Sequence, residues 1–174
     1  MRTLYTLTLL SLWLLPGALN AQVFKIYDNF SQLEERIAQA QGSTLLVINF
    51  WATYCKPCRE ELPYFNALHE KYANSDFRVI LVSLDFKSEL EKKFIPFLRD
   101  AALRPEIILL ADRYQDEWIP RLKPDWPGTL PLTMLVLGNN RAFREEEFQN
   151  FGELEQFVKD FCEKVGQPLS EGSN

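Results

Sequence analysis

Two cysteines three positions apart, Cys55 and Cys58, are the residues of this sequence best suited to chemistry. They follow a β-branched and aromatic run that ends at Phe50, and apolar residues recur at helical spacing after them. A cysteine at the start of a helix meets unpaired backbone N–H groups and the positive end of the helix dipole. Such surroundings lower a cysteine pKa from about 8.5 into the range of about 3.5–7.5. Lys56 adds a positive charge, so the spacing favours a reactive Cys55 thiolate.

The second cysteine gives this thiolate a partner. Cys58 lies almost one helical turn beyond Cys55, so the two sulfurs can close a small disulfide ring. Cys55, the more exposed of the pair in this arrangement, attacks a disulfide of another molecule and forms a mixed disulfide. Cys58 then attacks Cys55, which releases the reduced molecule and leaves Cys55–Cys58 oxidised. The same steps in reverse oxidise a dithiol. The pair therefore predicts thiol–disulfide exchange.

Other readings of the cysteines remain open. A CxxC pair is half of many zinc sites, and Cys162 with His69 brings the number of possible ligands to four. Cys162, however, falls on the apolar stripe of the last predicted helix, and His69 lacks a partner at metal-ligand spacing. We expect Cys162 to be a buried free thiol and His69 an exposed surface residue, with no metal site and no cofactor. The alternatives are a metal carrier that uses the CxxC thiolates and a non-catalytic partner-binding module.

Hydrophobic periodicity predicts strands that alternate with helices. Strands are expected at residues 23–27, 44–50, 77–84, 107–110, 132–137 and 141–144. Helices are expected from a capping box at 31–34 onward, and at 55–72, 88–101, 114–119 and 153–165. Strand–helix alternation followed by a hairpin and a last helix predicts an α/β fold, with a central mixed β-sheet flanked by helices on both faces.

The first 21 residues differ from the rest of the chain. Arg2 is their only charge, an apolar run follows, and small residues precede Gln22. This order is typical of a secretory signal peptide, cleaved after Ala21, and an uncleaved membrane anchor is the less favoured reading. We expect one domain at residues 22–174, exported to the periplasm, where disulfides persist. The net charge of −5 argues against a nucleic-acid partner.

Two segments resemble those of a known family. Residues 51–63, WATYCKPCREELP, resemble the active-site segment of exported thioredoxin-fold disulfide oxidoreductases of the TlpA-like and ResA-like family. Residues 126–136 resemble the family's cis-proline segment, and the likeness extends over most of the chain after residue 21. It implies a thioredoxin-like fold and a cis bond before Pro131, facing the cysteine pair. Leu130 would offer backbone groups to a bound peptide. Trp51, Leu130 and Pro131 are thus the predicted substrate-binding residues, although packing beneath the Cys55 turn suits Trp51 better.

The resemblance also gives Glu61 a role. Glu61 matches an acidic residue that the family places near the second cysteine, where it could manage protons during exchange. The helix dipole alone would also favour an acid here. Asn49 stands where thioredoxin itself has a buried Asp, so that base is absent. Cys55, Cys58 and Glu61 are the predicted catalytic residues.

Together these features predict an exported thiol:disulfide oxidoreductase. The Lys-Pro dipeptide between the cysteines favours a reductase, because a strongly oxidising member of the family often has His there. Protein thiols and disulfides are the expected partners, and by the resemblance a membrane electron donor supplies the reducing equivalents.

Overall fold

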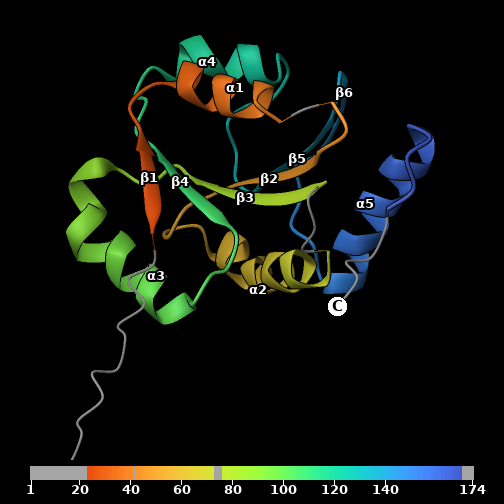
Figure 1. The fold of residues 1–174 in the computed structure, drawn as a ribbon. Coiled ribbons are helices and arrows are strands. Elements are labelled where there is room, and N and C mark those ends of the chain that lie inside the picture. Colours follow the sequence, from red (N-terminus) through yellow and green to blue (C-terminus); the bar gives the residue numbers. More distant parts are fainter. Residues whose placement is uncertain (1–22, 41, 73–75, 170–174) are drawn as a thin grey trace, which may run out of the picture.

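The computed structural model describes residues 23–40, 42–72 and 76–169 (Figure 1). Its strands are β1 (Phe24–Tyr27), β2 (Leu45–Trp51), β3 (Phe77–Ser83), β4 (Glu106–Leu110), β5 (Leu132–Leu137) and β6 (Asn140–Arg144). Its α-helices are α1 (Phe30–Ala38), α2 (Lys56–Lys71), α3 (Ile95–Ala101), α4 (Gln115–Leu122) and α5 (Phe151–Lys164). Two short segments, the 3₁₀ turn η1 (Lys87–Glu89) and the π-helical turn η2 (Leu90–Phe94), precede α3.

The strands form one mixed sheet in the order β1-β4-β3-β2-β5-β6. β1, β4, β3 and β2 run parallel, whereas β5 pairs antiparallel with β2 and β6 antiparallel with β5. Every residue of the central strand β2 is buried. This burial explains why its sequence is apolar except at Asn49, as expected for a strand covered on both faces.

Helices cover both faces of the sheet (Figure 1). α1 and α4 lie on one face, where the rings of Phe30 and Trp118 stack with centroids 5.0 Å apart. α2, α3 and α5 lie on the other face, where both cysteines of the CxxC pair join the buried cluster. The predicted α/β fold with helices on both faces is therefore confirmed.

One local prediction is wrong, and a second is confirmed only in part, since residues 88–101 are helical throughout but not as one regular α-helix. α1 is capped by Asn29, whose side chain accepts from Gln32 N while the Gln32 side chain accepts from Asn29 N. This reciprocal pair has the same spacing as the expected box at Ser31 and Glu34, and it lies two positions earlier. The helix expected at 88–101 is divided into η1, η2 and α3. Pro96 stands at the start of α3 and has no N–H for a bond to an earlier carbonyl, which breaks the regular helix there.

The predicted signal peptide, residues 1–21, lies outside the described residues. Within the part of the chain that the structure describes, none of the helices has the length and apolar content needed to cross a bilayer.

Candidate active site

A disulfide joins Cys55 and Cys58 at the amino end of α2. β2 ends at Trp51, a turn follows, and Cys55 is the N-cap residue of the helix, in an extended conformation. Its sulfur accepts a hydrogen bond from the backbone N–H of Cys58 at 3.3 Å. Pro57 occupies the first helical turn, where its missing N–H costs little. Cys55 thus lies where the helix dipole and a free N–H stabilise a thiolate.

The two sulfurs differ in access. Cys55 keeps 9% of its surface exposed, whereas Cys58 is fully buried. An incoming sulfur can therefore reach Cys55 first, in the order that the sequence predicts, although the opening is narrow. Cys162 is a buried free thiol on α5, as expected, and burial raises its pKa to about 11.

Glu61 is a buried carboxylate on α2, only 1% exposed. Its Oε1 accepts from Asn49 Nδ2 at 2.8 Å, and its Oε2 accepts from the backbone N–H of Phe148 at 2.9 Å. Asn49 Nδ2 also contacts Thr133 Oγ1 at 3.1 Å, so β2 and β5 both contribute to holding the carboxylate. Burial raises the pKa of Glu61 to about 7, against the opposing effect of the two hydrogen bonds. Glu147 adds to the rise and Arg144 opposes it. Near neutral pH this group can both take and give a proton.

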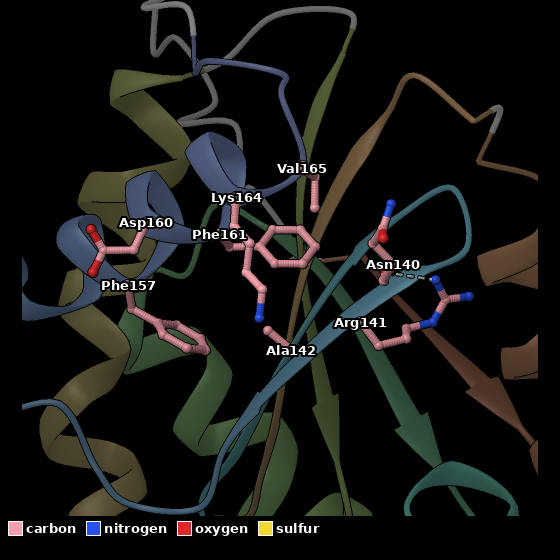
Figure 2. Close-up of a pocket in the computed structure, with 8 residues that line it drawn as sticks. All are labelled: Asn140, Arg141, Ala142, Phe157, Asp160, Phe161, Lys164 and Val165. Carbon is pink, nitrogen blue, oxygen red and sulfur yellow. Dashed lines mark hydrogen bonds between the residues drawn. The ribbon is translucent and has the colours of Figure 1, made fainter.

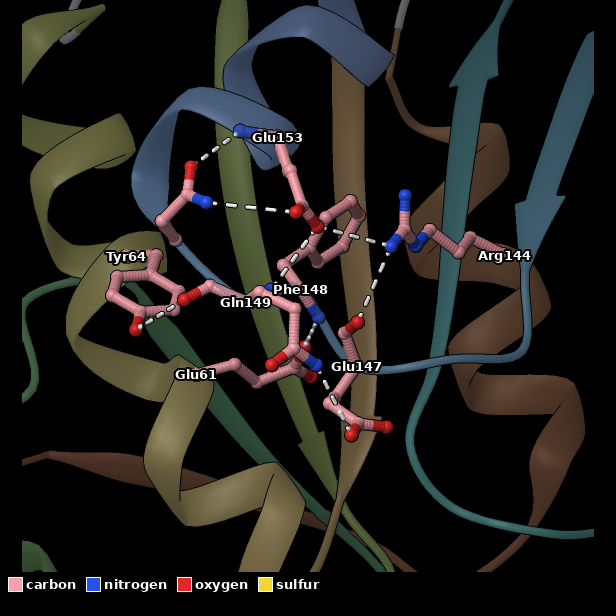
Figure 3. Close-up of polar contacts among 8 residues, drawn as sticks. Glu61, Tyr64, Arg144, Glu147, Phe148, Gln149 and Glu153 are labelled. Carbon is pink, nitrogen blue, oxygen red and sulfur yellow. Dashed lines mark hydrogen bonds and ion pairs between the residues drawn. The ribbon is translucent and has the colours of Figure 1, made fainter.

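The loop between β6 and α5 presents the Phe148 N–H (Figure 3). The Arg144 guanidinium lies over the Phe148 ring, 4.4 Å from its centroid, and pairs with Glu153 at 3.2 Å. On the other side, the Tyr64 hydroxyl donates to the carbonyl of Gln149 at 3.1 Å. β6, α2 and α5 thus hold the loop in place, and its N–H is fixed on the buried carboxylate.

The bond between Leu130 and Pro131 is cis, as the resemblance implies. Leu132 pairs with Phe50, so Pro131 comes level with the end of β2, at the edge of the sheet where the cysteine turn begins. Pro131 is buried, and half-buried Leu130 packs against the core cluster that contains both cysteines. Trp126 Nε1 donates to the Thr129 carbonyl at 2.9 Å and steadies this loop.

Trp51 does not offer a surface to a substrate. Its side chain is fully buried, with the rings of Phe94 and Phe97 at centroid distances of 6.1 and 5.3 Å. This burial does not favour the predicted contact between Trp51 and a substrate, because a side chain with no exposed surface has none to offer. Its aromatic packing supports the turn that precedes Cys55.

Asp85 is a site residue that the sequence analysis missed. It is 3% exposed, and its carboxylate accepts from the Thr53 backbone N–H at 2.9 Å and from the Thr53 hydroxyl. β2 and β3 are parallel neighbours, so their carboxyl ends meet at one edge of the sheet. An acid just past the end of β3 was thus a usable signal for a residue that braces the cysteine turn. The contact made by the Phe148 N–H leaves no signal in the sequence, since every loop residue except proline has a backbone N–H.

His69 does not join this site. It lies in the last turn of α2 and is half-buried rather than exposed as predicted, and this burial lowers its pKa. Within residues 23–40, 42–72 and 76–169, no three His, Cys, Asp or Glu side chains are grouped to hold a metal ion.

A cavity of about 380 Å³ lies between β6 and α5 (Figure 2). Phe157, Phe161 and Lys164 line it from the helix, and Ala142 from the strand. Neither α2 nor the turn before it contributes to the lining, so this cavity is separate from the cysteine pair.

Comparison with known proteins assigns the family. The model of the AhpC/TSA family matches residues 21–109, just over half of the chain, including both cysteines and Glu61. The chain belongs to the AhpC/TSA family.

Two curated relatives of this AhpC/TSA chain carry the name thiol-disulfide oxidoreductase ResA. The protein from Geobacillus thermodenitrificans is 32% identical over 110 residues, which are 63% of this chain and 57% of that protein. The protein from Oceanobacillus iheyensis is 31% identical over 74 residues, 42% of this chain and 38% of that protein. The chain therefore spans less than two thirds of the length of these relatives.

A solved structure supports the fold of this AhpC/TSA chain. A thioredoxin-related protein from Neisseria meningitidis serogroup B superposes with a TM-score of 0.57 at 21% identity. The superposition covers 72% of this chain and 90% of that one. The thioredoxin-like fold and the resemblance to ResA-like oxidoreductases are confirmed.

Proposed function

We propose that this protein is a thiol:disulfide oxidoreductase that reduces protein disulfides through Cys55 and Cys58. The observation that carries the proposal is the disulfide at the amino end of α2, with the accessible sulfur at the N-cap and the buried one behind it. The names of the ResA relatives support the same chemistry.

In the first step the reduced protein attacks its substrate. The Cys55 thiolate, stabilised by the Cys58 N–H and the helix dipole, attacks one sulfur of the substrate disulfide. A bond forms between Cys55 Sγ and that sulfur while the substrate disulfide breaks. The other substrate sulfur leaves as a thiolate and takes a proton from water.

In the second step Cys58 resolves the mixed disulfide. Cys58 and Glu61 are three positions apart on α2, so they share one face of the helix, and both are buried. Glu61 takes the Cys58 proton, and the thiolate attacks Cys55 Sγ. The second substrate sulfur leaves and is protonated. Two electrons have then passed from the cysteine pair to the substrate, which leaves as a dithiol.

Leu130 and Pro131 are the proposed substrate-binding residues. The edge of the sheet at which they lie is the edge where β2 leads into the cysteine turn, and Leu130 is half-buried. A peptide bound to Cys55 would find the backbone groups of Leu130 beside it.

The cellular setting belongs to the same proposal. We infer that residues 1–21 are a cleaved signal peptide and that residues 22–174 act as one domain in the periplasm. Protein disulfides would be the substrates there, and a membrane electron donor would return the Cys55–Cys58 disulfide to the dithiol.

Reduction of insulin by dithiothreitol, followed by turbidity, tests the activity. We expect the wild type to accelerate precipitation. Reduced Cys58→Ser, mixed with insulin after dithiothreitol has been removed, should accumulate a mixed disulfide with insulin that mass spectrometry detects. Cys162→Ser is the matched control and should behave as the wild type. Wild-type activity in Cys55→Ser would contradict the proposal and favour a non-catalytic binding module. Near-stoichiometric metal in the purified reduced protein would favour a metal carrier.

A further inference from the structure

Tyr54 and Phe86 form an exposed aromatic pair beside the reactive sulfur. Their rings stack with centroids 6.5 Å apart and an angle of 21° between the planes. Tyr54 is 62% exposed and Phe86 58%, and among the described residues Tyr114 is the one other exposed aromatic side chain, whereas Trp51 and Trp118 are buried. Single exposed apolar residues are ordinary, but adjoining ones mark a surface that binds another molecule. Tyr54 directly precedes Cys55, so this surface adjoins the redox site.

Hydrogen bonds beneath the pair fix its geometry. Asp85 accepts from the Thr53 N–H at 2.9 Å and from Ser83 Oγ at 2.7 Å, and it is almost fully buried. Tyr54 follows Thr53 in the chain and Phe86 follows Asp85. The contact between Asp85 and Thr53 therefore brings the two rings together. The rings are ordered before a partner arrives, which lowers the entropic cost of binding on them.

The surface continues beyond Phe86 into a cavity of about 320 Å³. This cavity lies between the segment after β3 and the segment after β4. Leu84 and Leu110 contribute apolar lining, whereas Lys87, Asp112 and Arg113 contribute charged side chains. Tyr54, Phe86 and the cavity thus form a strip that leads outward from Cys55. The two lysines nearest this strip in sequence already have acidic partners. Lys56 pairs with Glu60 at 3.5 Å, and Lys87 pairs with Asp28 at 2.9 Å.

We propose that Tyr54 and Phe86 are a docking platform for the polypeptide segment that carries the substrate disulfide, and that they select an aromatic or large aliphatic side chain near the substrate cysteine. This inference rests on the proposed function. A sulfur bonded to Cys55 brings its own chain next to Tyr54. An extended chain rises about 3.3 Å per residue, so a side chain one or two positions from the substrate cysteine reaches the rings. An apolar side chain fits because the platform is aromatic and the flanking lysines are paired.

Two peptides that differ at one position test the platform. Each contains one cysteine as a mixed disulfide with glutathione, and the position two residues from the cysteine is Phe in one peptide and Ser in the other. The second-order rate constant of the reduced protein is measured with each peptide by stopped-flow fluorescence. We expect the wild type to react with the Phe peptide about three to ten times faster, the gain typical of one aromatic contact.

Variants test whether the preference for the Phe peptide comes from Tyr54 and Phe86. Phe86→Ser and Tyr54→Ser should bring the ratio of the two rate constants close to one, and Phe86→Tyr should restore it. Val23→Ser removes a side chain that is 87% exposed elsewhere, and it should keep the wild-type ratio. A ratio unchanged in both Ser variants would overturn the platform. A concentration-dependent dimer that Phe86→Ser abolishes, together with a wild-type ratio of one, would identify a second copy of this chain as the occupant and also overturn it.

A small substrate separates the two proposals. Reduction of 2-hydroxyethyl disulfide by the wild type requires the cysteine pair but no platform. Failure of the wild type with this compound and with both peptides would contradict the proposed function. If the wild type reduces 2-hydroxyethyl disulfide and both peptides, and reduces the Phe and Ser peptides at equal rates, only the docking platform is overturned.

Discussion

The cysteine pair at the start of α2 and the single cysteine near the end of α5 place the same side chain in two opposite settings. Cys55 caps a helix, accepts a backbone N–H and keeps some exposed surface. Cys162 lies within a helix beside the apolar side chains of Leu45 and Leu137, and burial raises its pKa to about 11. A position at the amino end of a helix favours the thiolate of a cysteine, whereas burial among apolar side chains favours the neutral thiol.

The contrast extends to the neighbours of each sulfur. The cysteine pair has a buried acid, Glu61, about one turn further along its helix, and the pKa of this acid is raised to about 7. Cys162 has apolar surroundings that favour the neutral thiol. The first setting promotes exchange, and the second makes the thiol a small hydrophobic side chain.

The largest expected effect is the difference in activity between a variant that lacks the Cys55 sulfur and one that lacks the Cys162 sulfur. Cys55→Ser removes the attacking sulfur and should lower the rate of insulin reduction by about 10³-fold or more. Cys162→Ser should leave this rate within about twofold, because its sulfur takes no part in exchange. Insulin turbidity at matched protein concentrations measures both. Equal losses of insulin-reducing activity in the two variants would contradict the different roles given to Cys55 and Cys162.

Alkylation of the reduced protein compares the two thiols directly. At pH 7 iodoacetamide should modify Cys55 on the order of 100 times faster than Cys162, because the thiolate is the nucleophile and Cys162 is almost entirely protonated. Peptide mass spectrometry over time gives both rate constants. Comparable rates would show that the helix end does not activate Cys55.

Replacing Glu61 should change the pH dependence of the resolving step. Cys58 can pass its proton to ionised Glu61, so release of substrate from the mixed disulfide should rise with pH through about 7. Glu61→Gln should slow this release about tenfold at pH 8 and remove the inflection near pH 7. Quenched-flow measurement of substrate release tests this. Glu60→Gln, on the exposed side of the same turn, is the control and should keep the wild-type profile.

The same substitution has a stability signature of known sign. Burial raises the pKa of Glu61 from 4.5 to about 7, so the folded state binds this proton more tightly than the unfolded chain. Its contribution to stability is therefore fully present below pH 4.5 and is lost as pH rises through about 7. Urea titrations at several pH values should show this loss in the wild type and in Glu60→Gln, and its absence in Glu61→Gln would confirm the source.

The smallest effect concerns the buried thiol. Cys162→Ser places a hydroxyl among apolar side chains and should lower the free energy of unfolding by about 1–3 kcal/mol. Cys162→Ala removes the sulfur without adding a polar group and should cost less. Urea denaturation compares the two variants. A larger loss in the Ala variant would mean that the sulfur contributes mainly through volume.

Much of this site could be predicted from the sequence, because its central parts leave strong local patterns. The buried run before Cys55, the CxxC spacing and the proline in the first turn all lie between Leu45 and Cys58. The cis bond at Pro131 followed from resemblance and not from periodicity. Trp51 shows the limit of such reasoning, since a residue next to a site in sequence can lie wholly beneath it.

The remaining parts come from contacts between distant segments. Glu61 is held by a backbone N–H 87 positions away, and Thr53 by an acid 32 positions away. Every residue except proline has a backbone N–H, so no sequence pattern predicts that the N–H of Phe148 contacts Glu61. Asn29 was missed for another reason, because Ser31 and Glu34 offer the same capping spacing two positions later and sequence does not rank the two.

The distance between Glu61 and Phe148 bears on the order in which a newly made chain gains its reactivity. Synthesis delivers both cysteines and Glu61 long before the strand that carries Thr133 and the loop that carries Phe148. Without these segments, the Glu61 carboxyl lacks the burial that raises its pKa. Only in the folded chain is the pKa of Glu61 raised to about 7. The proton acceptor proposed for Cys58 therefore depends on a contact that the chain can form only after Phe148 has been synthesised.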